Sequence, residues 1–308
     1  MKKWTLFLSL YFCACLLVGC TTAAGTDAPA PGGTPSGEEQ TDGGTAQPAA
    51  AAVLCRVVSE EKGSVLLADT ESSVVYDLPL EGLTVTLDGQ PIDLTAPGAY
   101  QNLPAGSLAG ALAEITYDDD GMVLDSWPAQ FANVTAVNLR TEGFDDRCAL
   151  YLRVLEDLWA VDPGLNSDSL TYIGVDLSRT SLSESERAAV AWAFAGKHGA
   201  ESVEGTYDEL VEQGYITGEP LGGGAPADAK FWQWTDGCLF SITESDEPVV
   251  FSLPNIAPGE KPPAYDAVRF DAEKWRSGLG AYYFTDCTAV RNADGHWGDY
   301  TVGGEAIS

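Results

Sequence analysis

Residues 21–52 limit where packed structure can lie in this chain of 308 residues. The segment is mostly Ala, Gly, Pro and Thr, and its only charged residues are Asp27, Glu38, Glu39 and Asp42. No apolar period runs through it, so it cannot bury enough surface to offset the entropy lost on ordering. We interpret residues 20–52 as a disordered tether with a reach of roughly 30 Å. Folded structure is therefore expected only from residue 53.

The segment before the tether has the pattern of an export signal. Lys2 and Lys3 precede an almost wholly apolar run over residues 4–18, which is the length of a signal-peptide core and short for a membrane span. The run ends in Leu-Val-Gly-Cys at residues 17–20. This ending resembles the lipobox of bacterial lipoprotein signal peptides. The resemblance implies that residues 1–19 are removed and that the Cys20 thiol carries a diacylglycerol.

A lipid on Cys20 would place the mature chain at the cell membrane, on its extracellular face, anchored without spanning it. Two acyl chains contribute about 0.8 kcal/mol per buried methylene, which is enough for stable attachment. The alternative is an ordinary secreted protein in which Cys20 is incidental.

The charge of the chain limits its partners. The formal net charge is −30, so nucleic acid and anionic lipid headgroups would have to be approached against repulsion. We therefore expect no nucleic-acid partner. A basic peptide, a cation or a neutral sugar is compatible with this charge, which also keeps an exported protein soluble.

Residues 53–142 have the pattern of a small all-β module. Apolar runs at 53–58 and 64–69 are joined by Glu-Glu-Lys-Gly at 60–63, which predicts a hairpin. Two more strand pairs are expected, 73–78 with 83–87 and 111–117 with 122–126, and a last strand at 133–139. Turn residues at this spacing favour a small barrel or sandwich.

Two stretches of this module, residues 103–107 and 121–130, resemble a small OB-like domain of unknown function found in surface lipoproteins of Gram-positive bacteria. The second contains Ser126-Trp127-Pro128-Ala129, where many members carry Tyr in place of Trp. The resemblance implies an OB-like barrel and a surface location, and it assigns no catalytic residue. Residues 274–281 and 294–297 resemble the end of uncharacterised exported proteins, again without an implied activity.

Residues 143–308 have mixed periodicity and predict an α+β domain. Apolar residues three and four apart over 150–159 predict a helix that Asp162-Pro163-Gly164 ends. Ser183 with Glu186, and Thr206 with Glu209, predict two capping boxes. Strands are expected at 170–177, 231–243, 249–253, 280–290 and 297–302. This order favours helices on one face of an antiparallel sheet, and hence an α+β class for the whole chain.

The sequence contains no catalytic motif that would assign an activity. The chain has two histidines, His198 and His296, and it lacks the usual nucleophile-elbow, P-loop and zinc-protease patterns. We therefore expect a non-enzymatic binding or accessory role at the cell envelope. The alternative is an extracellular hydrolase that acts on cell-wall or carbohydrate material through acidic residues.

The cysteines outside the signal predict no metal or cofactor. Cys55, Cys148, Cys238 and Cys287 lack the paired spacing of a zinc site, and the acidic turn at 118–121 lacks the ligand spacing of a calcium loop. Cys238 and Cys287 both lie on expected strands, so a disulfide between them is the most plausible pairing. Otherwise each is a small buried apolar residue.

Aromatic residues provide the candidate ligand site. Trp232 and Trp234 alternate on one expected strand, and Tyr282, Tyr283 and Trp297 lie on others. Exposed rings on a sheet could stack on the sugars of a wall polymer, or hold a peptide or an envelope protein. The alternative is that one face of each strand simply belongs to the core.

Overall fold

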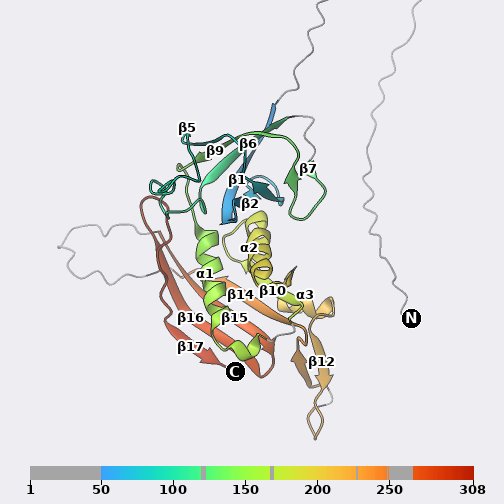
Figure 1. The fold of residues 1–308 in the computed structure, drawn as a ribbon. Helices are drawn as coiled ribbons and strands as arrows, with labels where there is room; N and C mark the ends of the chain where they lie inside the picture. The colour runs from blue at the N-terminus through green and yellow to red at the C-terminus, as the bar shows by residue number, and fades with distance from the viewer. Residues whose placement is uncertain (1–49, 119–122, 167–169, 227, 248, 250–265) are drawn as a thin grey trace, which may run out of the picture. The chain divides into compact units, whose positions relative to one another are not determined.

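Two large β-sheets and three α-helices make up the described part of the chain (Figure 1). The computed structural model describes residues 50–118, 123–166, 170–226, 228–247, 249 and 266–308. The fold is mostly β with some α, and its sheets are mixed. None of the helices in these ranges is long and apolar enough to cross a membrane.

The first sheet has the strand order β3-β2-β1-β6-β9-β4-β5. Its strands are β1 (Ala50–Glu61), β2 (Ser64–Asp69), β3 (Val75–Pro79), β4 (Val85–Leu87), β5 (Gln90–Pro91), β6 (Leu112–Asp118) and β9 (Val134–Arg140). The hairpin expected at 60–63 is confirmed: β1 and β2 are antiparallel, and Lys62 and Gly63 both have positive φ at the turn. Within the described residues this order is open at both ends.

Two of the expected strand pairs are wrong. β3 pairs with β2, and β4 pairs in parallel with β9, so β3 and β4 are not a hairpin. β6 lies between β1 and β9, while the short β7 (Val123–Leu124) pairs with β8 (Gln130–Phe131). The acidic turn itself, at 119–121, lies outside the described residues. The predicted apolar runs thus form strands as expected, but their pairing depends on contacts between distant parts of the chain.

The helices begin and end close to the expected places. They are α1 (Arg147–Ala160), the 3-10 turn η1 (Pro163–Leu165), α2 (Glu184–Lys197) and α3 (Tyr207–Glu212). Both predicted capping boxes are confirmed, because Ser183 and Thr206 accept the backbone N–H groups of Glu186 and Glu209 and the two glutamates accept in return. Local hydrogen bonding was sufficient to place these helix starts.

The second sheet is mixed, which corrects the expected antiparallel sheet. Its strands are β10 (Tyr172–Arg179), β11 (Glu201–Glu204), β12 (Thr217–Pro220), β13 (Lys230–Gln233), β14 (Gly237–Glu244), β15 (Asp266–Ser277), β16 (Gly280–Arg291) and β17 (Gly304–Ile307). β10 runs parallel to both β11 and β14, and the pairs β14–β15, β15–β16 and β16–β17 are antiparallel. The crossover from β10 through α2 to β11 accounts for the parallel pair.

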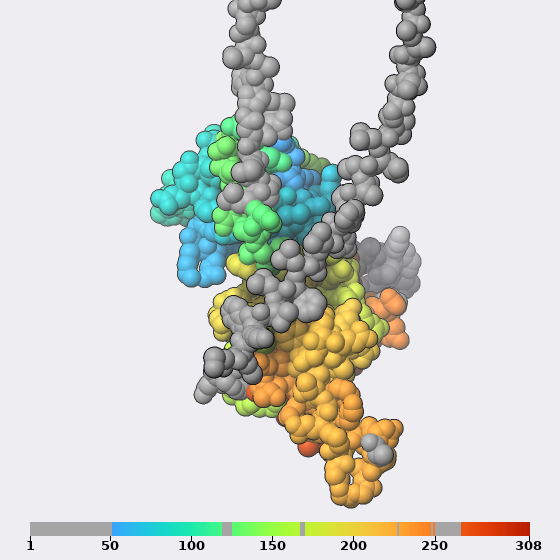
Figure 2. Space-filling model, turned by 90° about the vertical axis from the view of Figure 1, so that its right-hand side faces the viewer, coloured from blue at the N-terminus to red at the C-terminus, as the bar shows by residue number. Residues whose placement is uncertain are grey.

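Other strand predictions for this sheet need correction. The expected strand 231–243 is two strands, β13 and β14, and both pair with β15. Residues 297–302 form only isolated bridges, Arg291 with Trp297 and Thr288 with Thr301. Of the expected strand 249–253, residues 250–253 lie outside the described residues. The strand β12 and its partner β13 project from one end of the molecule (Figures 1 and 2).

The helices connect the two sheets through a common core. The described residues from Ala50 onward belong to one compact unit. The sequence boundary expected at 142/143 separates the strands of one sheet from those of the other, but Val58 and Leu66 of the first sheet share a buried cluster with α1 and α2. Ser185 of α2, fully buried, also donates its hydroxyl to the carbonyl of Asp69 at 2.7 Å.

Candidate functional site

An open cleft of about 810 Å³ lies where loops of the first sheet meet the turn after β16. Its lining comes from four separate stretches of the chain: Leu87 and Asp88, residues 101–104, residues 141–144 and residues 291–295. Its size is that of a small-ligand site. The sequence alone did not indicate that these stretches lie close together, because more than 200 residues separate the first from the last.

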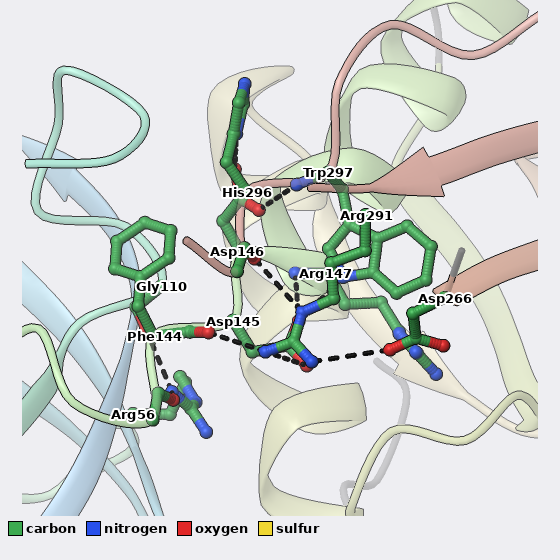
Figure 3. A network of polar contacts seen from close by, with 12 residues as sticks. Arg56, Gly110, Phe144, Asp145, Asp146, Arg147, Asp266, Arg291, His296 and Trp297 are labelled. Atoms are coloured by element: carbon green, nitrogen blue, oxygen red, sulfur yellow. Dashed lines mark hydrogen bonds and ion pairs between the residues drawn. The ribbon is translucent and has the colours of Figure 1, made fainter. Parts of the chain in front are cut away.

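Arg291 holds the two sides of this cleft together (Figure 3). Its guanidinium donates to the carbonyl of Phe144 at 2.7 Å and to the carbonyl of Gly295 at 3.2 Å. The same side chain forms ion pairs with Asp266 at 3.3 Å and Asp145 at 3.6 Å. A Cβ on Gly295 would lie 2.1 Å from the Phe144 carbonyl oxygen, so the close approach of the turn requires glycine.

Asp146 anchors the same turn from the other side. The residue is 3% exposed, and its carboxylate accepts the Trp297 backbone N–H at 2.7 Å and lies 2.6 Å from Nδ1 of His296. Because a carboxylate only accepts, Nδ1 of His296 donates and Nε2 is left as the acceptor in the neutral ring. In the part of the chain that the structure describes, Nε2 of His296 has no hydrogen-bond partner.

Trp297 completes the network below the turn. Its indole Nε1 donates to Asp145 at 2.8 Å, and the Arg147 guanidinium lies 4.5 Å from the ring centroid. The Trp297 side chain is fully buried in the core shared with α1. The network therefore fixes the turn at residues 291–295, which lines one side of the cleft.

The rim of the cleft is polar and carries both amides and the carboxylates of Asp88, Glu142 and Asp294. Gln101 and Asn102 carry exposed amides for which the described residues supply no hydrogen-bond partner. Asp88 is engaged, since it accepts the backbone N–H and the hydroxyl of Thr141 at 2.9 and 2.8 Å. Leu103 and Phe144 form an apolar base. Free amides over an apolar base suit a ligand that both donates and accepts hydrogen bonds.

The aromatic residues expected to bind ligand do not gather. Trp234 and Trp297 are fully buried in different core clusters, so neither ring is available to a ligand. Trp232 is half-buried beside Lys230, and Tyr282 donates its hydroxyl to Glu305 at 2.5 Å. Tyr283 follows Tyr282 on β16, so the two side chains point to opposite faces of the strand.

Two glycines explain why Trp234 enters the core. A Cβ on Gly174 of β10 would lie 2.7 Å from the Trp234 ring, and one on Gly237 would lie 2.0 Å from it. The indole therefore packs directly on the backbone of neighbouring strands. The alternation of Trp232 with Trp234 thus places Trp234 in a core cluster, against which the partly buried Trp232 also packs.

The expected disulfide between Cys238 and Cys287 is wrong. Both are buried free thiols, as are Cys55 and Cys148. β15 separates Cys238 on β14 from Cys287 on β16, and the register places them beside positions of β15 that are six residues apart. Six residues of strand correspond to about 20 Å, far beyond the reach of a disulfide.

The other expected sites have mixed outcomes. Cys20, the candidate lipidation site, lies outside the described residues. Among the residues that the structure describes, no three His, Cys, Asp or Glu side chains gather as metal ligands. His198 is not part of the cleft: it stacks on Trp159 with a centroid distance of 3.8 Å.

Comparison with known proteins identifies no relative: no protein family matches the chain, no curated protein does, and no solved structure does.

Proposed function

We propose that this protein is a lipid-anchored binding protein on the extracellular face of the cell membrane, and that its cleft takes a neutral saccharide segment of a wall polymer. The single observation that carries the ligand class is the pairing of free amides with an apolar base in the cleft. Gln101 and Asn102 can exchange hydrogen bonds with hydroxyl groups, while Pro104, which is partly exposed next to the buried Leu103, can contact the apolar face of a sugar ring.

The charge of the protein supports a neutral ligand. With a net charge of −30, an anionic polymer would approach the cleft against repulsion. Arg291, which could have attracted an anion, already donates to Phe144 and Gly295 and pairs with Asp145 and Asp266. Its role is to hold the cleft in shape.

A binding measurement with an N-acetylglucosamine trimer tests this proposal. The full-length protein in non-ionic detergent should bind the trimer in calorimetry, and the double variant Gln101→Ala with Asn102→Ala should weaken binding about thirtyfold, because each of the two lost hydrogen bonds contributes about 1 kcal/mol. Gln213→Ala, an exposed amide outside the cleft, is the matched control. Equal affinity in all three proteins would remove the cleft as the ligand site.

Fractionation tests the anchoring separately. We expect the wild-type protein in the membrane fraction and labelled by a fatty-acid analogue. Cys20→Ala should lose the label and the membrane attachment. A Cys20→Ala protein that still carries the label would refute lipidation at this residue.

We also propose that the first sheet is the small OB-like module that residues 103–107 and 121–130 resemble. Its support is the segment before β9, where Ala129 exchanges backbone hydrogen bonds with Val75 and Asp77 of the edge strand β3, at 2.9 and 3.0 Å. These bonds lead from one edge of the sheet toward the other, as in a partly open barrel.

An extracellular hydrolase acting on carbohydrate is the second candidate function. The Asp146–His296 pair favours it, because a buried carboxylate orients the imidazole and leaves Nε2 as a base. His296→Ala and Asp146→Asn would then abolish release of reducing ends from wall glycan. If wild-type protein binds the trimer without releasing any product, the binding role stands.

A further inference from the structure

The end of the β1–β2 hairpin lies against α1 and α2 and leaves two hollows, of about 590 and 550 Å³. Both are lined by Ser59 and Glu61 of the hairpin and by Ala193 and Lys197 of α2. We call the two hollows together the hairpin groove. Its lining shares no residue with the cleft described above.

The floor of the hairpin groove is apolar. Leu152 of α1 and Trp192 and Ala193 of α2 are partly buried and pack on the main core, and Leu66 of β2 continues this surface. Apolar atoms supply most of the exposed lining in both hollows. Such a surface can bury the aliphatic part of a ligand.

The rim carries carboxylates whose charge is not neutralised by the groups that hold them. Glu60 accepts the hydroxyl of Tyr100 at 2.6 Å, and Asp157 accepts that of Tyr300 at 2.6 Å. In the second hollow, Asp77 accepts the hydroxyl of Ser64. A hydroxyl fixes the position of a carboxylate but leaves it anionic. Burial and the Glu60 carboxylate raise the pKa of Tyr100 to about 12, so Tyr100 remains a donor.

The basic side chains of the groove are already engaged. Nζ of Lys197 lies 3.1 Å from Glu156. The Arg153 guanidinium pairs with Asp299, outside the groove, at 3.4 Å and donates to the carbonyls of Trp297 and Gly298 at 3.1 and 2.8 Å. Lys62 pairs with Glu61 at 3.0 Å. The carboxylates of Glu60, Asp77 and Asp157 thus remain for a cation supplied by a partner.

We propose that the hairpin groove docks an extended basic segment of a partner polypeptide. The aliphatic stems of its Lys or Arg residues would lie on the apolar floor, and their charged ends would meet Glu60 and Asp157 in one hollow and Asp77 in the other. Charge complementarity selects this occupant, because an acidic or neutral peptide would leave the fixed carboxylates without a counter-charge. This surface is independent of the saccharide cleft.

Fluorescence anisotropy with a labelled peptide of alternating Lys and Leu tests the proposal, using the full-length protein in non-ionic detergent. Glu60→Gln with Asp157→Asn keeps acceptors for both tyrosine hydroxyls and removes two charges. We expect peptide affinity to fall about tenfold. The control, Glu212→Gln with Glu219→Gln, removes two exposed charges elsewhere and should change affinity less than about twofold.

A second variant tests shape without changing charge. Ala193→Trp places an indole in the surface that both hollows share. It should lower the affinity for the peptide at least as much as the charge variant does. Thermal unfolding followed by circular dichroism verifies that each variant is folded. The proposal is overturned if the control pair weakens binding equally, if Ala193→Trp binds normally, if a Glu-Leu peptide binds as well, or if spermine competes as effectively as the unlabelled peptide.

Discussion

Nζ of Lys274 lies 2.5 Å from the carbonyl oxygen of Val161, so a lysine on β15 closes the C-terminal end of α1. The Lys274 side chain is fully buried, and its ammonium also donates to the carbonyl of Asp162 at 3.2 Å and to Oδ1 of Asn166 at 3.1 Å. The last carbonyls of a helix lack intrahelical partners and carry partial negative charge, which a cation satisfies. The corner between α1 and η1 is therefore held by the sheet.

Replacement of Lys274 by Met should destabilise the fold by about 3 kcal/mol, because it leaves buried carbonyl oxygens without donors. Urea unfolding measures the free energy of unfolding. Lys62→Met, at the exposed hairpin turn, is the comparison and should cost less than about 0.5 kcal/mol. Equal effects of the two substitutions would show that the Lys274 contacts contribute no stability.

His198 should make stability depend on pH. Burial lowers the pKa of His198 below its usual value, and the nearby Glu156 only partly opposes this. The folded state thus favours the neutral ring, so the stability contribution is complete above about pH 6.5 and is lost as pH falls through the folded-state pKa. His198→Phe keeps an aromatic ring against Trp159 and removes this titration.

Unfolding free energies at pH 7, 6 and 5 check this. Wild type should lose stability faster than His198→Phe toward pH 5, by at most about 1.4 kcal/mol per pH unit. Parallel curves for the two proteins would assign the acid sensitivity to other groups.

The four cysteines of the folded part should be free and unreactive in the native state. Burial raises the pKa of both Cys238 and Cys287 to about 12, and a thiol in this state is a poor nucleophile. We expect slow reaction with a thiol reagent in buffer and four rapid modifications in denaturant. A melting temperature that falls on addition of reductant would contradict this result.

The loss of stability on replacing a tryptophan by alanine should follow how deeply its ring is buried. Trp234→Ala and Trp297→Ala should each cost about 3–5 kcal/mol, because both remove fully buried rings. Trp232→Ala should cost less, since Trp232 keeps part of its surface in solvent. Denaturant midpoints provide the ranking, and a Trp232→Ala effect as large as the other two would place that ring in the core as well.

Local features of the fold were predictable from the sequence. The capping boxes at Ser183 and Thr206, the Lys62-Gly63 turn and the end of α1 before Pro163 all rest on groups a few residues apart. β15 was missed, although its buried positions alternate as Val268, Phe270, Ala272 and Lys274. A lysine at a core position interrupts the apolar pattern, and only the distant acceptors at the end of α1 explain it.

The sequence by itself predicted most helices and strands and led to the hypothesis of a lipid on Cys20. It placed the start of folded structure at residue 53, whereas β1 already begins at Ala50. Tertiary structure decided which strands pair, that Trp234 and Trp297 are core residues, and that Cys238 and Cys287 remain apart. It also formed the cleft, since Arg291 meets Phe144 across 147 residues of chain. Short-range hydrogen bonds and turn geometry can be read from neighbouring residues, whereas contacts between distant segments depend on packing of the whole fold.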